Sequence, residues 1–240
     1  MMAGTLILLG QAGYELHMMN IANGSCGSAT MDKDTTIATR LGEARDAAKA
    51  LGAILHEPLV DDLEIFYGPS LLRRVAAVIR EVNPAILLLH SPQDYMEDHM
   101  NACRLALSAA FSRGMRNYTT DPPRPAVEGE VTVYHALPYG LRDGLRQRIE
   151  PHLYVDISEV LPRKREALAC HRSQKEWLDH SQGLDSYLIT MEDMSREVGR
   201  WSRQFAYAEG WRRHLHLGFC GEGADPLVQS LGAKALSRSE

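Results

Sequence analysis

The stretch HSPQDYMEDHMNACRLA, residues 90–106, brings together side chains that could do chemistry. Asp94, Glu97, Asp98 and His99 follow an apolar run and precede a helical pattern. Carboxylates at such a junction are typical of a solvated helix N-terminus, where they interact favourably with the helix dipole. A carboxylate beside a histidine can instead orient the imidazole, act as a base or help to hold a metal ion. Both interpretations are open until the elements that position the stretch are known.

The elements around this stretch alternate between strands and helices. Apolar periodicity and end signals predict helices over 2–12, 35–51, 68–82 and 99–113, and strands over 14–21 and 84–90, with a short strand in AILHEPLVDD. This alternation indicates an α/β fold with a mainly parallel sheet flanked by helices. In such sheets ligands bind beyond the carboxyl ends of the strands, where the loops NGSCGS, EPLVDDLE and SPQDYMEDH are expected.

The second half of the chain predicts a surface loop, two strands and a helical region. The segment 117–129 is rich in proline and predicts a surface loop, and strands are expected over 131–138 and 153–158. Beyond these the segments 159–181 and 191–203 predict a helical C-terminal region. We expect residues 1–220 to form a single domain and the polar tail 221–240 to fray.

Composition excludes several classes of function. The 240 residues carry 26 Lys plus Arg against 31 Asp plus Glu, a net charge of −5, with no clustered basic run. Nucleic acid and anionic membranes are therefore not expected partners. The longest apolar runs are too short to span a bilayer, and no export signal is recognisable. Four cysteines without a close pair argue against a disulfide framework or a cysteine zinc site, and favour the cytoplasm.

Other candidate residues have structural explanations of their own. Arg40 and Glu43 are spaced for a surface salt bridge on one helix face, and Asp62 could simply stabilise a turn. His135 lies in an apolar strand, where a histidine is usually part of the core. His214 and His216 alternate in an extended segment without a visible third metal ligand. Ser173 has no base at a recognisable spacing, which excludes it as a nucleophile.

The order of motifs resembles the N-acetylglucosaminyl-phosphatidylinositol de-N-acetylase family, also called PIG-L or LmbE-like. The similar segments are AGTLILLGQAGYELHMMNIANG, RLGEARDAAKALGA, LLHSPQDYMEDHMNACRLA and KREALACHRSQ, which together span roughly residues 3–175. The resemblance implies a Rossmann-like sheet and a zinc-dependent hydrolase that removes an acetyl group from an amino sugar or its conjugate. It implies a small-molecule substrate, and it leaves a homo-oligomer open.

One hallmark of the family is missing from the sequence. Relatives carry an AHPDD-type motif at the end of a strand just before the first helix, and it supplies two zinc ligands and the general base. No His-Pro-Asp-Asp occurs in the 240 residues. We therefore expect a central strand and half of the metal site to be absent from the chain, through a start assigned too late or a truncated gene. Weak zinc binding, little deacetylation and poor solubility are the expected consequences.

The remaining family positions can be transferred residue by residue. The resemblance implies that His99 is a zinc ligand and that Asp98 orients catalytic groups. Met96 replaces the histidine that steadies the oxyanion, and His135 is the candidate to take over that role. Arg40, Asp62 and Asp94 are the candidate substrate-binding residues.

Two other classes of function compete with a deacetylase. A catalytically inactive member that acts as a sugar-binding or oligomeric module is the alternative to a deacetylase. A dinucleotide-binding protein is disfavoured, because GQAGYE is not a GxGxxG fingerprint and follows a helix rather than a strand.

Overall fold

Strands and helices alternate through the first half of the chain. The structure is a computed structural model that describes residues 1–182 and 187–238. The first half runs through α1 (Ala3–Gln11), β1 (Leu16–Met19), α2 (Lys33–Leu51), β2 (Ala53–His56), α3 (Pro69–Val82), β3 (Ile86–Leu89) and α4 (Glu97–Phe111). The predicted helices and strands of this half are therefore confirmed, with small shifts at their ends.

Local signals explain where these helices begin and end. Asp32 caps α2, its side chain accepting a hydrogen bond from the backbone N–H of Thr35 at 2.9 Å. Gly52 ends α2 with a φ of 74°, a left-handed conformation that glycine adopts without strain. Pro69 opens α3, where its missing N–H costs nothing, and Asn83 closes it.

The second half contributes both strands and helices. It comprises β4 (Thr132–Ala136), β5 (Leu153–Asp156), α5 (Leu161–Ala169), α6 (Arg172–Gln182), α7 (Tyr187–Ser202), β6 (Ala208–Arg213), α8 (Pro226–Leu231) and β7 (Ala235–Ser237), with short 3₁₀ turns at Tyr139–Leu141, Ser158–Val160 and Gly232–Lys234. The expected helical region is thus present, but it is followed by two strands. In the described part of the tail, residues 221–238, β7 pairs with β5 and Leu227 of α8 is fully buried, so this part is ordered rather than frayed.

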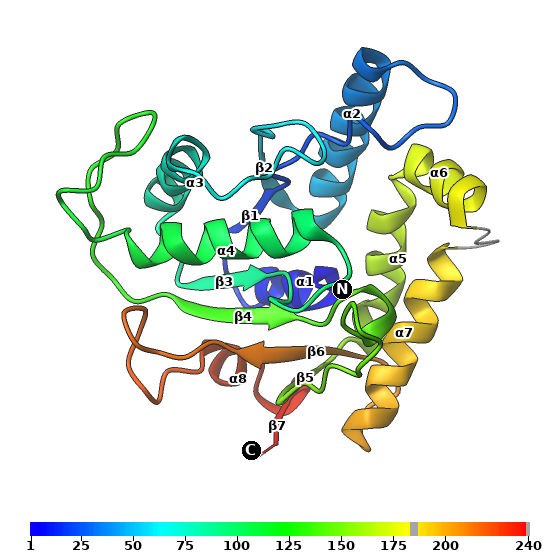
Figure 1. Ribbon diagram of the computed structural model, residues 1–240. Helices are drawn as coiled ribbons and strands as arrows, with labels where there is room; N and C mark the ends of the chain where they lie inside the picture. Colours follow the sequence, from blue (N-terminus) through cyan, green and yellow to red (C-terminus); the bar gives the residue numbers. More distant parts are fainter. Residues whose placement is uncertain (183–186, 239–240) are drawn as a thin grey trace.

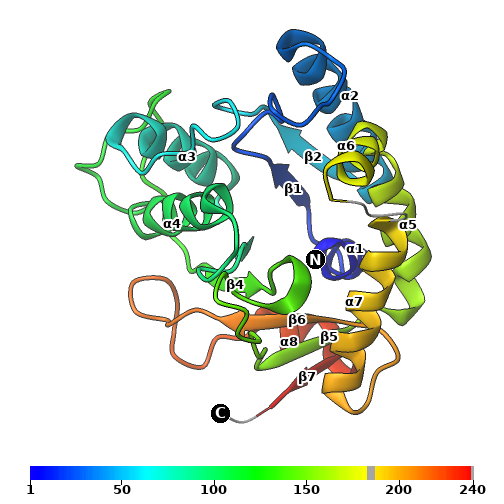
Figure 2. The same cartoon turned by 45° about the vertical axis from the view of Figure 1, so that its right-hand side comes forward.

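The strands fall into two groups, as Figures 1 and 2 show. β1 and β2 pair in parallel, with Leu16 opposite Ala53. The second group has the order β3–β4–β6–β5–β7 and is mixed: β3 and β4 are parallel, whereas β6 runs antiparallel to both β4 and β5. The α/β class is confirmed, and the parallel character is limited to the two pairs β1–β2 and β3–β4.

Helices cover the strands on both sides (Figure 2). One apolar cluster joins α3 and α4 to the segment after β1, through residues such as Ile21, Val75 and Leu105. A larger cluster packs α1 and α5 against β4, β5 and β6, with Ile7 and the fully buried Trp211 among its members. Within the described residues, none of the helices combines the length and apolar composition needed to cross a membrane.

Candidate functional site

The loops at the carboxyl ends of β1, β2 and β3 meet at one edge of the fold. Gly24 and Cys26, after β1, donate their backbone N–H groups to the two carboxylate oxygens of Asp62, after β2, at 3.0 and 2.9 Å. Leu63 donates its N–H to Asp98 Oδ2 on α4 at 2.7 Å. These bonds place the acidic stretch at the edge where ligands bind in such folds, as the sequence predicts.

Asp94 and His99 form the central pair of this edge. Asp94 Oδ1 lies 3.1 Å from His99 Nδ1, and the same oxygen accepts a hydrogen bond from the N–H of Met96. Asp94 is buried, whereas the His99 side chain keeps 30% of its surface exposed. A carboxylate can only accept, so Nδ1 carries the proton and Nε2 is left free to accept one or to bind a metal.

Two aromatic rings that the sequence analysis did not select surround His99. His90 stacks on it with ring centroids 4.6 Å apart, and Tyr95 meets it edge-on at 5.7 Å. Burial, helped by the neighbouring His99, lowers the pKa of His90 to about 4, so this imidazole is neutral at pH 7. His90 ends the predicted strand 84–90, and that position at the carboxyl edge was the available signal.

Asp98 and Asp62 both have structural partners here. Asp98 is buried at the first turn of α4 and holds the loop after β2 through Leu63, whose φ of 65° is left-handed. Asp62 holds the loop after β1 in the same way. Asp62 therefore ties the loops after β1 and β2 together, and Asp98 ties the start of α4 to the loop after β2, whatever each contributes to substrate binding.

Arg40 lies beside the first loop, on α2. It donates to the backbone carbonyl of Gly27 at 2.6 Å and to Gln174 of α6, while its Nε is buried without a partner among the described residues. Desolvation lowers the Arg40 pKa, against the opposing charges of Glu43 and Asp62. The expected surface pair with Glu43 does not form, because Glu43 instead accepts two hydrogen bonds from Ser173.

His135 lies in β4 among buried groups. Its Nδ1 is 2.9 Å from the carbonyl oxygen of His90 and 3.5 Å from Cys103 Sγ, and its Nε2 is 3.0 Å from His214 Nδ1. Burial lowers the His135 pKa to about 4. The His135 ring thus contacts His90 at the end of β3, and both of its nitrogens have hydrogen-bond partners.

A cavity of about 760 Å³ brings part of this site together. Asp62, His90, Met96, Asp98 and His99 line its polar end, next to the apolar side chains of β1 and β3. Asp94 lies behind His99. Within the described part of the chain, Arg40 and His135 are not among the lining residues, so the cavity brings together only some of the predicted site.

The described residues do not fit a complete zinc site. They include no group of three His, Cys, Asp or Glu side chains placed to hold one ion. His99 has a free Nε2, but Asp94 and Asp98 are committed to His99, Met96 and Leu63. A second imidazole pair, His17 and His56, lines the cavity further along β1 and β2 and is joined through ring nitrogens at 2.9 Å. Zinc needs three or four protein ligands, and of these residues His99 is the one whose ring nitrogen is free to bind an ion.

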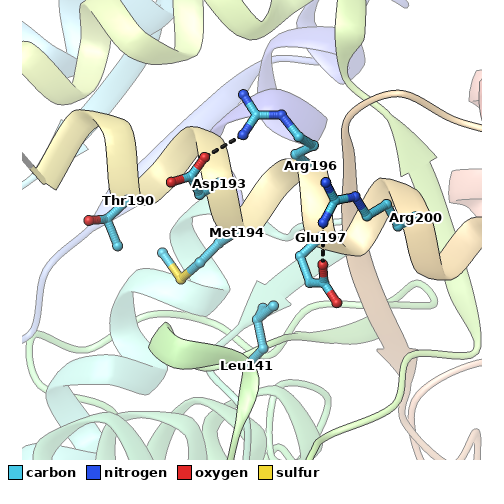
Figure 3. A pocket seen from close by; sticks show the side chains of 7 residues that line it. All are labelled: Leu141, Thr190, Asp193, Met194, Arg196, Glu197 and Arg200. Carbon is cyan, nitrogen blue, oxygen red and sulfur yellow. Dashed lines mark hydrogen bonds and ion pairs between the residues drawn. The ribbon is translucent and has the colours of Figure 1, made fainter.

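A second hollow of about 440 Å³ lies along α7 (Figure 3). Its charged side chains neutralise one another: Asp193 pairs with Arg196, and Glu197 lies 3.3 Å from Arg200. Glu197 also accepts a hydrogen bond from the Trp201 indole. Both pairs join residues three apart along α7. The acidic groups that line this hollow are therefore already engaged in ion pairs.

The chain is similar in sequence and in fold to known proteins. The chain is 27% identical over 216 residues to a 4-oxalmesaconate hydratase of Pseudomonas putida, covering 86% of this chain and 81% of that protein. It is 26% identical to a diacetylchitobiose deacetylase of Thermococcus kodakarensis, covering 72% of this chain and 64% of that protein. The crystal structure of the 4-carboxy-2-hydroxymuconate hydratase of Pseudomonas putida superposes with a TM-score of 0.70 at 25% identity, covering 88% of each chain.

The family assignment rests on the first part of the chain. Residues 1–110 match the family model described as PIG-L: GlcNAc-PI de-N-acetylase. This segment contains α1 through most of α4 and therefore the loops that carry Asp62 and Asp94 and the first turn of α4 with Asp98 and His99. Residues 1–110 of this chain are a PIG-L family domain.

Proposed function

We propose that the protein is an amide hydrolase that removes an acetyl group from an amino sugar or its conjugate. The observation that carries the proposal is the buried Asp94 bonded to the partly exposed His99, at the polar end of a cavity within a PIG-L family domain. The similarity to a diacetylchitobiose deacetylase supports this choice of substrate.

The reaction needs a base for water and an acid for the leaving amine. Asp94 holds the proton on Nδ1 of His99, so Nε2 can take a proton from water as the water oxygen attacks the acetyl carbon. The carbon–nitrogen bond then breaks, the amine nitrogen takes that proton, and acetate leaves. Asp98 holds the start of α4, and thus His99, against the loop after β2.

Zinc dependence is the finer part of the proposal. Among the described residues we assign His99 as the one ligand, because Asp94 fixes its ring and leaves Nε2 available. An ion held by Nε2 would prevent that nitrogen from taking a proton, so the ligand role and the base role of His99 are alternatives, which the assays with added zinc and after chelation separate. The described residues do not complete the site, and the steps above rely on none of the metal's chemistry. The four free cysteines favour a reducing compartment such as the cytoplasm.

A hydratase is the second candidate, favoured by the 27% identical relative and by the superposed hydratase structure. The same pair could deliver water to a carbon–carbon double bond conjugated with a carboxylate. In that case no bond to nitrogen breaks, and the proton is returned to the neighbouring carbon. The two reactions differ in their products, which makes them easy to separate.

The test measures both products on the same protein. The purified chain is incubated with N,N′-diacetylchitobiose, followed by amine release, and with an unsaturated dicarboxylic acid, followed by loss of its conjugated absorbance. Both assays are run with added zinc and after chelation, on the 240-residue chain and on one extended by a strand that ends in His-Pro-Asp-Asp.

We expect amine release that is greater in the extended protein and is lost in its His99→Ala variant. His216→Ala is the matched control, because this half-buried histidine lies outside the cavity lining. Equilibrium dialysis should show zinc binding that also depends on His99. Amine release that is indifferent to His99→Ala would exclude the proposed role, and hydration without amine release would favour the second candidate.

A further inference from the structure

His90 differs from its neighbouring imidazoles in its hydrogen bonds. Asp94 holds Nδ1 of His99, and both nitrogens of His135 have partners. Within residues 1–182 and 187–238, by contrast, nothing bonds to either ring nitrogen of His90, and the hydrogen bond that this residue does accept goes to its backbone carbonyl. The His90 side chain therefore keeps its full capacity to bond to a ligand.

The ring of His90 is nevertheless fixed in position. His90 directly follows β3, and its carbonyl oxygen accepts a hydrogen bond from Nδ1–H of His135 in β4 at 2.9 Å. Its ring stacks on that of His99, with the centroids 4.6 Å apart and the two planes inclined by only 18°. A side chain that is held in this way can meet a ligand with little loss of rotamer entropy.

The free nitrogens of His90 open onto the cavity. The ring is largely buried, yet the enclosed side-chain atoms without a partner among the described residues belong to Arg40, Arg80 and Tyr118, and not to His90. The His90 nitrogens therefore keep access to open space, and at this position that space is the cavity whose polar end the residue lines. A polar group that is mostly desolvated costs free energy unless water or a ligand bonds to it, so the arrangement is that of a binding group.

The stack sets two ring edges side by side at the polar end of the cavity. A hydrogen bond spans about 3 Å, so an acetamide bound here can have its carbonyl oxygen against His90 while the attacking water lies against His99. Attack moves negative charge onto that oxygen, and a donor that is already in place inside a protein cavity stabilises such charge strongly. An imidazole carries at least one N–H in either charge state, so the donor is present whatever the protonation of His90.

We propose that His90 is a catalytic residue of this site, whose ring N–H binds the carbonyl oxygen of the substrate and stabilises the negative charge that develops there. The proton stays on His90 throughout, and His99 remains the group that moves a proton. The assignment rests on the proposed amide hydrolysis and adds to it the group that recognises the carbonyl. His135 does not serve in this way, because its Nδ1–H already bonds to the His90 carbonyl and its Nε2 to His214.

The test separates the hydrogen bond from the stacking. His90→Phe keeps an aromatic ring against His99 and removes the N–H, whereas His90→Gln restores an amide N–H without the ring. His56→Phe is the matched control, because it replaces an imidazole that lines the cavity further along β2. Each version of the 240-residue chain is assayed for amine release from N-acetylglucosamine and for its melting temperature.

A binding probe makes the test independent of turnover. In N-methylphosphonyl glucosamine a tetrahedral phosphorus with a charged oxygen replaces the acetyl carbon, so the probe imitates the charge that attack produces. Its affinity and that of N-acetylglucosamine are measured by isothermal titration calorimetry. Nitrogen-15 NMR follows the labelled His90 imidazole, whose resonance should shift when the probe is added to the native chain.

The hydrogen bond should act mainly on the transition state. His90→Phe should lower kcat by about 100-fold or more with little change in KM, because the bond strengthens only as the charge develops. The same variant should weaken binding of the phosphonyl probe by a similar factor and change binding of N-acetylglucosamine by less than about threefold. His90→Gln should recover part of both losses, and His56→Phe should match the native chain.

Unchanged affinity of His90→Phe for the phosphonyl probe would overturn the assignment, as would failure of the native chain to bind that probe. Equal losses in His90→Phe and His90→Gln, accompanied by lower melting temperatures, would also overturn it, because they would show that the ring supports the fold. A native chain that binds the probe through His90 but releases no amine would contradict the proposed hydrolysis and would keep His90 as the donor to a carbonyl oxygen.

Discussion

Asp94 and His99 meet across the first turn of α4, with 3.1 Å between Oδ1 and Nδ1. Because α4 begins at Glu97, the helix fixes His99, while the loop before it places the carboxylate behind the ring. The pair depends on the junction of loop and helix, which is why both an acidic helix start and a chemical site were reasonable interpretations of the sequence. The structure is consistent with both interpretations, because Asp94, an acid at the start of α4, also orients the His99 ring.

The first prediction concerns that orientation. Asp94→Asn should lower kcat/KM for amine release by about 10–100-fold, because a neutral amide lacks the charge that stabilises the His99 imidazolium formed when Nε2 takes a proton. The melting temperature should change little, since the side chain keeps its size and can still accept from the Met96 N–H. Steady-state kinetics and a thermal melt measure both effects. Glu97→Gln, an exposed acid in the same turn, is the control and should leave kcat/KM unchanged.

A second prediction concerns the buried carboxylate of β6. Glu209 is fully buried and accepts hydrogen bonds from the N–H groups of Gly4 and Thr5 at the start of α1. It also lies 2.8 Å from Lys164 Nζ. Glu209→Gln leaves that ammonium uncompensated, so we expect the free energy of unfolding to fall by about 3–5 kcal/mol.

Urea unfolding at pH 7 measures this loss. Glu159→Gln removes one partner of the exposed pair with Lys234 and should cost less than about 1 kcal/mol. If Glu209→Gln and Glu159→Gln lowered the free energy of unfolding equally, the buried pair of Glu209 and Lys164 would not help to hold α1 in place. Burial opposes ionisation of Glu209, but Lys164 and the Met1 amine outweigh it and lower its pKa. Its contribution is therefore present above the ordinary carboxyl pKa and is lost as pH falls through the folded value.

Glu209 also explains one limit of sequence-based prediction. The segment AYAEGWRR gives no alternating pattern, because a charged residue sits at a position that is fully buried in the fold. Among the described residues, Lys164 of α5 and the N-terminus of α1 compensate that buried charge, and neither is near in sequence. β6 was missed for this reason. Helices α2 and α3, by contrast, follow from local caps and periodicity, which operate within a few residues.

The candidate site divides in the same way. His99 and Asp94 are five residues apart on one junction, so a local motif sufficed to select them. His90 was missed because its role arises from stacking on His99 across the turn between β3 and α4. The environment of His135 depends on β6, whose His214 neighbour enters through a strand that sequence reasoning did not recognise.

The third prediction separates a structural from a binding role for Asp62. Asp62→Ala should speed hydrogen exchange at the amides of Gly24 and Cys26, because both lose their acceptor. The expected loss in stability is about 1–3 kcal/mol. Glu64→Gln, an exposed acid of the same loop, should change neither. If exchange at Gly24 and Cys26 is unaffected while KM rises, the carboxylate serves the substrate and the loop does not need it.

The last prediction concerns the stability of the fold in acid. Burial, together with the nearby charges of His214 and Arg212, holds the pKa of His135 at about 4, against an ordinary value of 6.5. Between these values the unfolded chain binds a proton that the folded chain refuses, so stability must fall as pH is lowered from 6.5 to 4. The slope from this one group approaches about 1.4 kcal/mol per pH unit.

His135→Gln removes the titrating ring. Below pH 6.5 it should reduce the slope of unfolding free energy against pH by that amount relative to the native chain, although it lowers stability at pH 7 through lost contacts with His90, Cys103 and His214. Urea unfolding at half-unit steps of pH gives both curves, and His216→Gln should keep the native slope. A His135→Gln curve parallel to the native one between pH 6.5 and 4 would show that His135 takes up a proton as easily when folded as when unfolded, and that its burial does not keep it neutral.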